Sequence, residues 1–516
     1  MTSSIHQEPA LQPLNEYNQA LMAHVHPPDW VNPSPAERYD LVVIGAGTAG
    51  LVVAAGAAGL GLGLKIAIIE RSLMGGDCLN VGCIPSKCLI RSSRVAADMR
   101  TSAPFGIQPP ETVEVDFAAV MQRMRQIRAG ISHHDSAARF RDLGIDVFLG
   151  SGEFVNEGAI AVDNRQLRFK KAVIATGARA THPDIPGLAE AGYLTNETVF
   201  SLTVQPRRFA VIGGGPIGCE LAQAFRRLGS EVAIVHKNAH LLDREDADAA
   251  ELVQQQFLQE GVNLILNSTV ERIEITETGK RLYCRQADHS TQTIEVDEIL
   301  IGAGRTPNVS GLNLDAANVQ YDARKGVVVN DYLQTTNPKI YAAGDICMNW
   351  KFTHAADAAA RIVIKNLLFS PFGFGRSKLS SLVMPWVTYT DPEIAHVGLY
   401  EAEAKANGVE TDTILIPFSK LDRALADGEP EGFAKILHRR GSDQILGATI
   451  VARHAGEMIS EVTLAMVTKQ GLNALSGVIH PYPTQAEAIR KAADAYRRTL
   501  LTPRTQALLR ILTRFS

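Results

Sequence analysis

The segment with the clearest chemical potential covers residues 75–88, which read GGDCLNVGCIPSKC and hold Cys78 and Cys83 five positions apart. Pro85 and Lys87 follow the second cysteine. Such a pair could form a zinc site, a structural disulfide or a working redox couple. A zinc site needs about four ligands at suitable spacing, and no second C-x-x-C or H-x-x-x-H stands out. A structural disulfide would be unusual in a reducing compartment, so the redox interpretation explains more of the segment.

The spacing of the two cysteines also predicts the local geometry. Five residues along a straight helix rise about 7.5 Å, which exceeds the usual reach of a disulfide. We therefore expect Cys78 in a distorted turn and Cys83 at a helix start, with Pro85 in the first turn. A helix N-terminus and the charge of Lys87 would both stabilise a thiolate. Glycines before Cys78, among them Gly76, allow the close approach of a flat cofactor ring.

A dinucleotide-binding fingerprint precedes this segment. The apolar run YDLVVI is followed by Gly45, Gly47 and Gly50 in the pattern G-x-G-x-x-G. A small-residue helix and a second strand, LKIAIIE, then end at Glu70. The glycines let the backbone approach a pyrophosphate at the helix N-terminus, and an acid about 20 residues on binds a ribose hydroxyl.

The same pattern recurs later in the chain. The strand RFAVI leads into Gly213, Gly215 and Gly218, and a helix and the strand EVAIVHK follow. Two nucleotide-binding folds in one chain suggest a bound flavin and a diffusible nicotinamide. The chain resumes the first fold only after the second, through AVIATG, EILIGAGRTPN and YAAGD. Candidate cofactor-binding residues in these turns are Thr176, Gly177, Gly304 and Asp345.

The second fingerprint differs from the first in the residue at the ribose position. His236 occupies the position that matches Glu70, Lys237 follows it, and Arg244 is nearby. A carboxylate there would repel a ribose 2′-phosphate, whereas cations would attract it. The sequence therefore favours NADPH over NADH, with a solvated basic loop as the alternative.

Composition limits the classes of protein that the chain can represent. The 516 residues include 51 basic and 55 acidic side chains, so the net charge of −4 gives no overall basic footprint for nucleic acid. Six cysteines are too few for a disulfide-dense secreted scaffold. Residues 41–64 are uncharged, but they are glycine-rich and contain the fingerprint, which argues against a membrane span. We expect a cytoplasmic protein.

The motif GGDCLNVGCIPSK resembles the active-site motif of the FAD-dependent pyridine nucleotide–disulfide oxidoreductases, and the resemblance extends over residues 38–500 in the same motif order. It implies FAD held by the first fingerprint, Glu70 and Asp345, and a homodimer whose C-terminal domain completes the partner's active site. It also implies that Cys83 faces the flavin and Cys78 meets the substrate. Lys87 is then expected beside the flavin N5, paired with a glutamate that matches Glu220.

The C-terminal acid/base region departs from the disulfide reductases in this family. They carry a His-Pro-Thr with a glutamate four residues after the proline, and here the run is HPYPTQAE. Aligned on Pro-Thr and Glu487, Tyr482 takes the histidine's place and His480 lies two residues early. Mercuric reductases also place a tyrosine there, but this chain lacks their vicinal C-terminal cysteines and their N-terminal metal-binding domain.

These features lead to a ranked set of hypotheses. The leading one is an enzyme that passes electrons from NADPH through FAD to a Cys78–Cys83 disulfide and on to Hg(II) or a similar thiol-bound soft metal, for which the two cysteines would be transient ligands. The alternative is a disulfide reductase or dihydrolipoamide dehydrogenase-like enzyme. A redox-sensing flavoprotein with little turnover is a further alternative, although a pure binding module has no need of the dithiol.

The expected architecture is α/β, with two Rossmann-like domains and a C-terminal α+β dimerisation domain. The tail places Leu508, Leu512 and Phe515 on one helical face and Arg510 and Arg514 on another. It favours packing against the dimer over contact with a membrane surface. The predicted segments are an arm (1–37), an FAD-binding domain (38–185 and 306–378), a nicotinamide-nucleotide domain (186–305), a dimerisation domain (379–500) and the tail (501–516).

Overall fold

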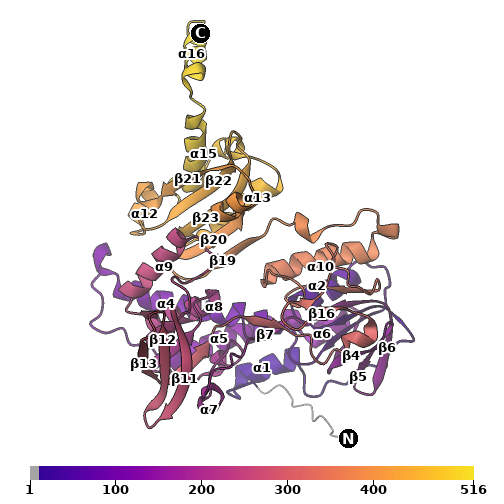
Figure 1. Cartoon of the computed structure of the whole chain (residues 1–516). Coiled ribbons are helices and arrows are strands. Elements are labelled where there is room, and N and C mark those ends of the chain that lie inside the picture. Colours follow the sequence, from indigo (N-terminus) through magenta and orange to yellow (C-terminus); the bar gives the residue numbers. More distant parts are fainter. Residues whose placement is uncertain (1–10, 516) are drawn as a thin grey trace.

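The computed structural model describes residues 11–515 and divides into two nucleotide-binding sheets and a C-terminal sheet that stands above them (Figure 1). The sheets differ in strand direction. The two nucleotide-binding sheets have parallel cores, whereas the C-terminal sheet is antiparallel. This architecture confirms the predicted fold class.

The first sheet is built around a buried strand that carries the first fingerprint at its end. Its parallel order is β3-β2-β1-β6, and β18 pairs with the other side of β6. The strands are β1 (Tyr39–Ile44), β2 (Ile66–Glu70), β3 (Ile145–Leu149), β6 (Arg165–Ile174) and β18 (Ile340–Ala342), and β4 (Gly152–Asn156) and β5 (Ala159–Val162) form an antiparallel extension of β6. Since β18 comes after the second sheet in sequence, the chain completes its first fold last.

Helices cover this sheet and bring distant segments to the strand ends. They are α1 (Glu16–Val25), α2 (Thr48–Ala58), α3 (Gly76–Asn80), α4 (Cys83–Arg100), α5 (Phe117–Ile131), α6 (Ala137–Asp142) and α10 (Thr353–Leu368). The fingerprint helix α2 packs on α10 through small residues that include Ala54, Ala57 and Ala359. A side chain at Gly56 would approach within 2.6 Å of Ile364, so this contact needs the glycine. The close packing holds the start of α10 near the fingerprint loop.

The second sheet repeats the arrangement in a smaller form. Its order is β10-β9-β8-β14, and a separate antiparallel sheet, β11-β12-β13, flanks it. The elements are β8 (Arg208–Ile212), α8 (Pro216–Leu228), β9 (Glu231–Val235), α9 (Ala247–Gln259), β10 (Asn263–Ile265), β11 (Ser268–Thr276), β12 (Gly279–Gln286), β13 (Thr291–Val296) and β14 (Glu298–Ile301), with α7 (Leu188–Ala191) at the entry. Two crossing segments, β7 (Ala178–Ala180) and β15 (Arg305–Pro307), pair with each other between the two sheets.

The C-terminal domain is a five-stranded sheet packed on helices. Its order is β19-β20-β23-β22-β21, and its apolar core includes Ile450, Val462 and Ile489. Its elements are β19 (Pro385–Thr388), β20 (Glu393–Gly398), α11 (Glu401–Ala406), β21 (Thr411–Pro417), α12 (Asp422–Ala426), β22 (Phe433–Arg439), β23 (Ile445–Ala452), α13 (Ala455–Val467), α14 (Leu472–Ser476) and α15 (Glu487–Thr499). A short hairpin of β16 (Tyr321–Asp322) and β17 (Gly326–Val327) lies earlier, over the first fold.

A buried carboxylate joins the second nucleotide fold to the C-terminal sheet. The carboxylate of Glu245 accepts hydrogen bonds from Trp386 Nε1 at 2.9 Å and from the Tyr400 hydroxyl at 2.6 Å. His396 is fully buried and stacks on Tyr400 with ring centroids 3.7 Å apart. Beside this contact, Lys435 Nζ lies 2.6 Å from Asp246. We call these contacts of Glu245 and Asp246 the interdomain latch.

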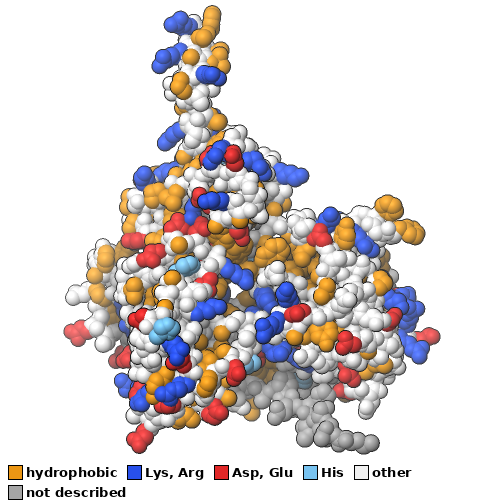
Figure 2. All heavy atoms as spheres, in the orientation of Figure 1, with side chains coloured by type: hydrophobic (Ala, Val, Ile, Leu, Met, Phe, Trp, Pro, Cys, Tyr) orange, Lys and Arg blue, Asp and Glu red, His pale blue; other side chains and the backbone are white. Residues whose placement is uncertain are grey.

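The two ends of the chain lie on opposite sides of the molecule. The final helix, α16 (Pro503–Leu512), stands clear of the body at the top of Figure 1, and none of its residues is buried. Figure 2 shows arginine and apolar side chains exposed along it. Both interpretations of the tail, packing on a partner and contact with a membrane, therefore stay predictions. Within residues 11–515, no helix is long and apolar enough to cross a bilayer.

Candidate functional site

The two cysteines lie where two short helices meet. Cys78 is within α3, which ends at Asn80, and Cys83 is the first residue of α4. Both are free thiols and partly buried, and the Cys78 thiol donates a hydrogen bond to Cys83. Cys83 Sγ also lies 3.3 Å from the hydroxyl of Thr353, the first residue of α10. The predicted helix start at Cys83 is confirmed, and a second helix N-terminus meets the same sulfur.

The surroundings of Cys83 favour its thiolate. The hydrogen bond from Cys78 lowers the pKa of Cys83 to about 6, helped by the Thr353 hydroxyl and the Lys87 charge and opposed by burial. The same hydrogen bond, together with burial, raises the pKa of Cys78. At pH 7 Cys83 is therefore ionised and Cys78 is protonated. This asymmetry suits a pair in which one sulfur donates charge and the other exchanges with a substrate.

Lys87 lies one turn after Cys83 on α4 and is fixed by two contacts. Its Nζ lies 2.8 Å from Glu220 Oε2 on α8, and 4.3 Å from the centre of the Tyr389 ring. The other oxygen of Glu220 accepts the backbone N–H of Tyr389 at 3.0 Å. Although burial lowers the pKa of Lys87, Glu220 more than offsets that effect and raises it. The structure thus brings together the lysine and glutamate that the family resemblance pairs.

The redox helix lies directly against the first fingerprint loop. A Cβ on Gly76 would approach within 2.6 Å of the Gly47 Cα, so this contact requires glycine, and Gly76 has a left-handed φ of +57°. Gly45 is equally constrained, since its Cβ would lie 2.4 Å from the Ala175 carbonyl oxygen. The loop and the cysteines therefore face one space, as a dinucleotide with a redox-active ring requires.

Two buried carboxylates flank that space. Glu70 accepts the backbone N–H groups of Ala46 and Ser72, each at 2.7 Å, which orients the loop. Burial raises the pKa of Asp345, which lies 3.3 Å from Arg305 Nε. Arg305 also pairs with Asp77, the residue before Cys78. An oriented loop, an acid at the end of β2 and a second buried acid fit the pyrophosphate, ribose and polyol groups of FAD.

The second fingerprint loop has the same backbone design. A Cβ on Gly218 would lie 2.1 Å from the Gly213 carbonyl oxygen, whereas a Cβ on Gly215 would meet no atom within 4 Å. Gly215 therefore borders open space at the start of α8, where a pyrophosphate can bind. The loop keeps the close helix–strand contact and leaves room for a ligand.

The structure corrects the role predicted for His236. Its Nδ1 accepts the backbone N–H of Gly214 at 3.0 Å, and its Nε2 lies 2.9 Å from Asp243. A ring nitrogen that accepts an N–H carries no proton, so the ring is neutral and donates to Asp243. His236 is buried and orients the loop as Glu70 does in the first fold. Lys237 and Arg244, both exposed, remain as the predicted cations.

The predicted cofactor residues in the crossing segments meet at one asparagine. Asn308 Nδ2 donates to the Thr176 carbonyl at 2.9 Å, and the Asn308 N–H donates to the Gly177 carbonyl at 3.0 Å. Gly304 accepts the N–H of Thr181 at 3.0 Å. These bonds fasten the two chain crossings between the nucleotide folds, so the folds are held at a fixed separation on this side.

The three candidate acid/base residues of the C-terminal domain face different surroundings. The Tyr482 side chain is 70% exposed, and its hydroxyl donates to Asp422 at 3.0 Å. The side chain of His480 is only 4% exposed and lies 3.1 Å from Glu461 on α13. Glu487, at the start of α15, lies 2.7 Å from Arg490. Within one chain, then, Tyr482 is available at the surface and His480 is turned into its own domain.

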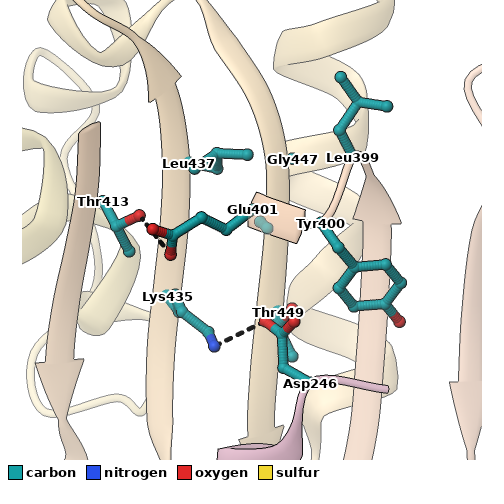
Figure 3. Close-up of a pocket in the computed structure, with 10 residues that line it drawn as sticks. Asp246, Leu399, Tyr400, Glu401, Thr413, Lys435, Leu437, Gly447 and Thr449 are labelled. Carbon is teal, nitrogen blue, oxygen red and sulfur yellow. Dashed lines mark hydrogen bonds and ion pairs between the residues drawn. The ribbon is translucent and has the colours of Figure 1, made fainter. Parts of the chain in front are cut away.

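Several residues near the dithiol could not be found from the sequence. Thr353 lies 270 positions from Cys83, and Tyr389 belongs to the C-terminal sheet. Arg305 stands beside Gly304 in the run that the sequence marks as a turn, but nothing there indicates its contact with Asp77. A small pocket at the interdomain latch lies away from the cysteines. Figure 3 shows Lys435 reaching toward Asp246 there, with Tyr400 alongside.

Comparisons with known proteins cover most of the chain. Residues 39–360 match the pyridine nucleotide-disulphide oxidoreductase family, and residues 384–493 match its dimerisation domain. A mercuric reductase from Bacillus cereus is 35% identical over 454 residues, which is 88% of this chain and 71% of that protein. A dihydrolipoyl dehydrogenase from Chlamydia trachomatis is 34% identical over 467 residues, covering 89% and 96%.

Solved structures show the same architecture. A Cu(II) complex of the HOCl-induced flavoprotein disulfide reductase RclA from Escherichia coli has a TM-score of 0.79 at 28% identity, and the match covers 89% of this chain and 99% of that one. The LpdA structure from Mycobacterium tuberculosis has a TM-score of 0.79 at 27% identity, with 90% and 100% covered. With an ionised cysteine beside a lysine–glutamate pair and two fingerprint loops, the chain belongs to the pyridine nucleotide-disulphide oxidoreductases, which are FAD-dependent and use NAD(P)H.

Proposed function

We propose that the protein reduces a soft metal ion held by its dithiol, with Hg(II) as the most suitable acceptor and NADPH as the electron donor. The observation that carries this proposal is the contrast between Tyr482, which is exposed, and His480, which is turned toward Glu461. Disulfide exchange leaves a thiolate that must be protonated, and a histidine suits that task near neutral pH. Because Asp422 raises the pKa of Tyr482 further, this tyrosine is a poor proton carrier at pH 7.

A metal acceptor needs ligands more than it needs a proton carrier. Thiolates are soft ligands, and the ionised Cys83 is ready to bind a soft cation while Cys78 loses its proton on binding. Bound FAD would relay two electrons from NADPH to this site. Hg(II) held by both sulfurs would accept the electron pair, the two sulfur–metal bonds would break, and Hg(0) and two thiolates would remain. Lys87 would compensate the negative charge beside Cys83 throughout.

The proposal includes a dimer in which a partner chain supplies the tyrosine. The chain carries the dimerisation domain of its family. An apolar surface surrounds Tyr482, formed by the exposed side chains of Leu464, Val467, Val478 and Ile479. Such a surface is typical of a chain–chain contact. In this arrangement Tyr482 would reach the dithiol of the partner subunit.

Disulfide reduction of the dihydrolipoyl dehydrogenase type is the second candidate function. It is favoured by the 34% identity to the Chlamydia trachomatis enzyme over nearly its full length. It requires His480 to leave Glu461 when two chains assemble. A redox-sensing role with little turnover is the third candidate, and an intact dithiol with an ionised Cys83 speaks against it.

The acceptor panel is the direct test of this function. NADPH oxidation is followed with Hg(II) plus excess thiol, with lipoamide and with glutathione disulfide, on one preparation. We expect kcat/KM for Hg(II) to exceed the other two values by about tenfold or more. Free thiol is needed because the chain has no cysteine after Cys347 to deliver the metal. Faster turnover of lipoamide than of Hg(II) would favour the second candidate, and negligible turnover of all three would favour the third.

The nucleotide preference can be tested separately. Charge-assisted hydrogen bonds from Lys237 and Arg244 to a 2′-phosphate would contribute roughly 1.5–3 kcal/mol each at most. We therefore expect kcat/KM for NADPH to exceed that for NADH by about tenfold or more. Lys237→Ala and Arg244→Ala should each reduce this ratio. Arg207→Ala, an exposed arginine at the opposite end of β8, is the matched control and should leave the ratio unchanged. A wild-type ratio near one would refute the cation assignment.

A further inference from the structure

The N-terminal arm, residues 11–37, bonds to the carboxyl ends of two strands in the first fold. The Val25 carbonyl accepts the N–H of Met74 at 3.1 Å, and His26 Nδ1 donates to the Ser72 carbonyl at 2.5 Å. Farther on, Trp30 Nε1 donates to the Val147 carbonyl at 3.2 Å. The arm thus crosses the segment that follows β2 and the outer edge of β3, which is the edge strand of its sheet.

These strand ends are the place where the adenosine half of FAD must lie. In a dinucleotide fold the pyrophosphate binds at the first helix and the acid at the end of the second strand takes the ribose, so the adenine lies beyond that acid. The acid here is Glu70, and its partner in strand register is Leu149. His26 is close enough to Glu70 for its charge to affect the carboxylate, since it lowers a pKa that burial raises.

A hollow lies at this position between the arm and the fold. It measures about 140 Å³ and is lined by Met22, His26, Pro27, Pro28, Trp30 and Leu149. Apart from the histidine, its walls are apolar and include a flat indole ring, which suits a planar base. His26 Nδ1 is used by Ser72, and within residues 11–515 its Nε2 has no recorded partner. That nitrogen could therefore serve a ligand as a hydrogen-bonding edge.

We propose that the arm completes the binding site for the adenosine half of FAD, with His26 and Trp30 as further FAD-binding residues. The arm then retains the cofactor by covering the end of the site that the strands leave open. This inference rests on the cofactor of the family and is independent of the electron acceptor.

A purely structural role for the arm is the competing explanation, and the chain offers a control for it. Asn32 exchanges two hydrogen bonds with the backbone of Leu149, at 2.9 and 2.8 Å, and so covers the open edge of β3 without lining the hollow. Asn32→Ala should therefore weaken the attachment of the arm but leave the hollow chemically intact. His26→Asn keeps a short side-chain N–H for Ser72 and removes the Nε2 edge, and Trp30→Ala removes the ring.

The test uses the holoenzyme and separates flavin release from unfolding. On heating, flavin release is followed by the rise in flavin fluorescence, and unfolding by circular dichroism; the dissociation constant is measured by re-adding FAD. We expect His26→Asn and Trp30→Ala to bind FAD about five- to tenfold more weakly and to release it below their unfolding temperature. Asn32→Ala should release flavin only as it unfolds. FAD affinity within twofold of wild type in both His26→Asn and Trp30→Ala would overturn the proposal, as would equal weakening in Asn32→Ala.

Discussion

Cys83→Ser should lower NADPH-dependent turnover of every acceptor by about a thousandfold or more. A serine hydroxyl is not ionised at pH 7 and cannot form the disulfide, so the relay from flavin to acceptor is lost. The same variant should lose the long-wavelength absorbance that a thiolate gives against oxidised flavin in the two-electron-reduced enzyme. Both effects are measured on one sample, by stopped-flow reduction with NADPH and by steady-state turnover.

Two other cysteines make this experiment specific. Cys78→Ala should abolish turnover but keep the absorbance band, because the flavin-side thiolate is intact. Cys88→Ser changes a buried cysteine in the same helix and should retain both activity and band. A band that persists in Cys83→Ser would show that another sulfur faces the flavin.

The pH dependence of the band follows from the lowered pKa of Cys83. A pKa of about 6 means that the thiolate dominates above pH 6 and is lost as the pH falls through that value. In Cys78→Ala the hydrogen bond that contributes most to this lowering is absent, so the midpoint should move upward, toward the ordinary thiol value. A midpoint that stays near 6 in Cys78→Ala would assign the lowering to Thr353 and Lys87 instead.

Tyr482→Phe should lower Hg(II) reduction roughly 10- to 100-fold, the range seen when a group that orients a metal site is removed. The hydroxyl is the polar atom of the exposed Tyr482 side chain, and phenylalanine removes it while keeping the ring. His480→Ala should leave Hg(II) reduction nearly unchanged, because its side chain is directed at Glu461. Both variants are compared in kcat with Hg(II) plus thiol and with lipoamide.

One pattern of results would require the other function. If the wild type turns over lipoamide rapidly, and His480→Ala abolishes that activity while Tyr482→Phe does not, the mercuric-reductase-like proposal must be abandoned. Gel filtration of each variant is the control, since a loss of the dimer would remove the partner residue whatever its identity.

Much of the fold and of the dithiol site could be predicted because local physics determines it. The spacing of Cys78 and Cys83 excludes a continuous helix, and Pro85 places the new helix start. Gly45 and Gly213 stand at left-handed turns that backbone contacts enforce, so their patterns are visible without a structure. Position alone identified His236 as the counterpart of Glu70, and that correspondence holds in the two loop contacts.

The remaining features depend on contacts that no spacing in the sequence records. The neutral state of His236 follows from two hydrogen-bond partners, one of them Asp243, which a sequence pattern treats as unrelated. Thr353 reaches Cys83 only because small residues let α10 pack closely on α2. The opposite orientations of His480 and Tyr482, two residues apart, arise from their neighbours Glu461 and Asp422.

The interdomain latch has a consequence for how assembly and nucleotide binding influence each other. The loop that carries Asp243 and Arg244 continues directly into Glu245, whose carboxylate is held by Trp386 and Tyr400. α13, which presents the exposed Leu464 and Val467, packs on the two strands β19 and β20 that adjoin this contact. If docking of a second chain on α13 stabilises one arrangement of these strands, it changes the affinity of the loop for its nucleotide. Thermodynamic linkage then requires the reverse effect with the same factor, so the nucleotide would shift the monomer–dimer equilibrium to the same degree.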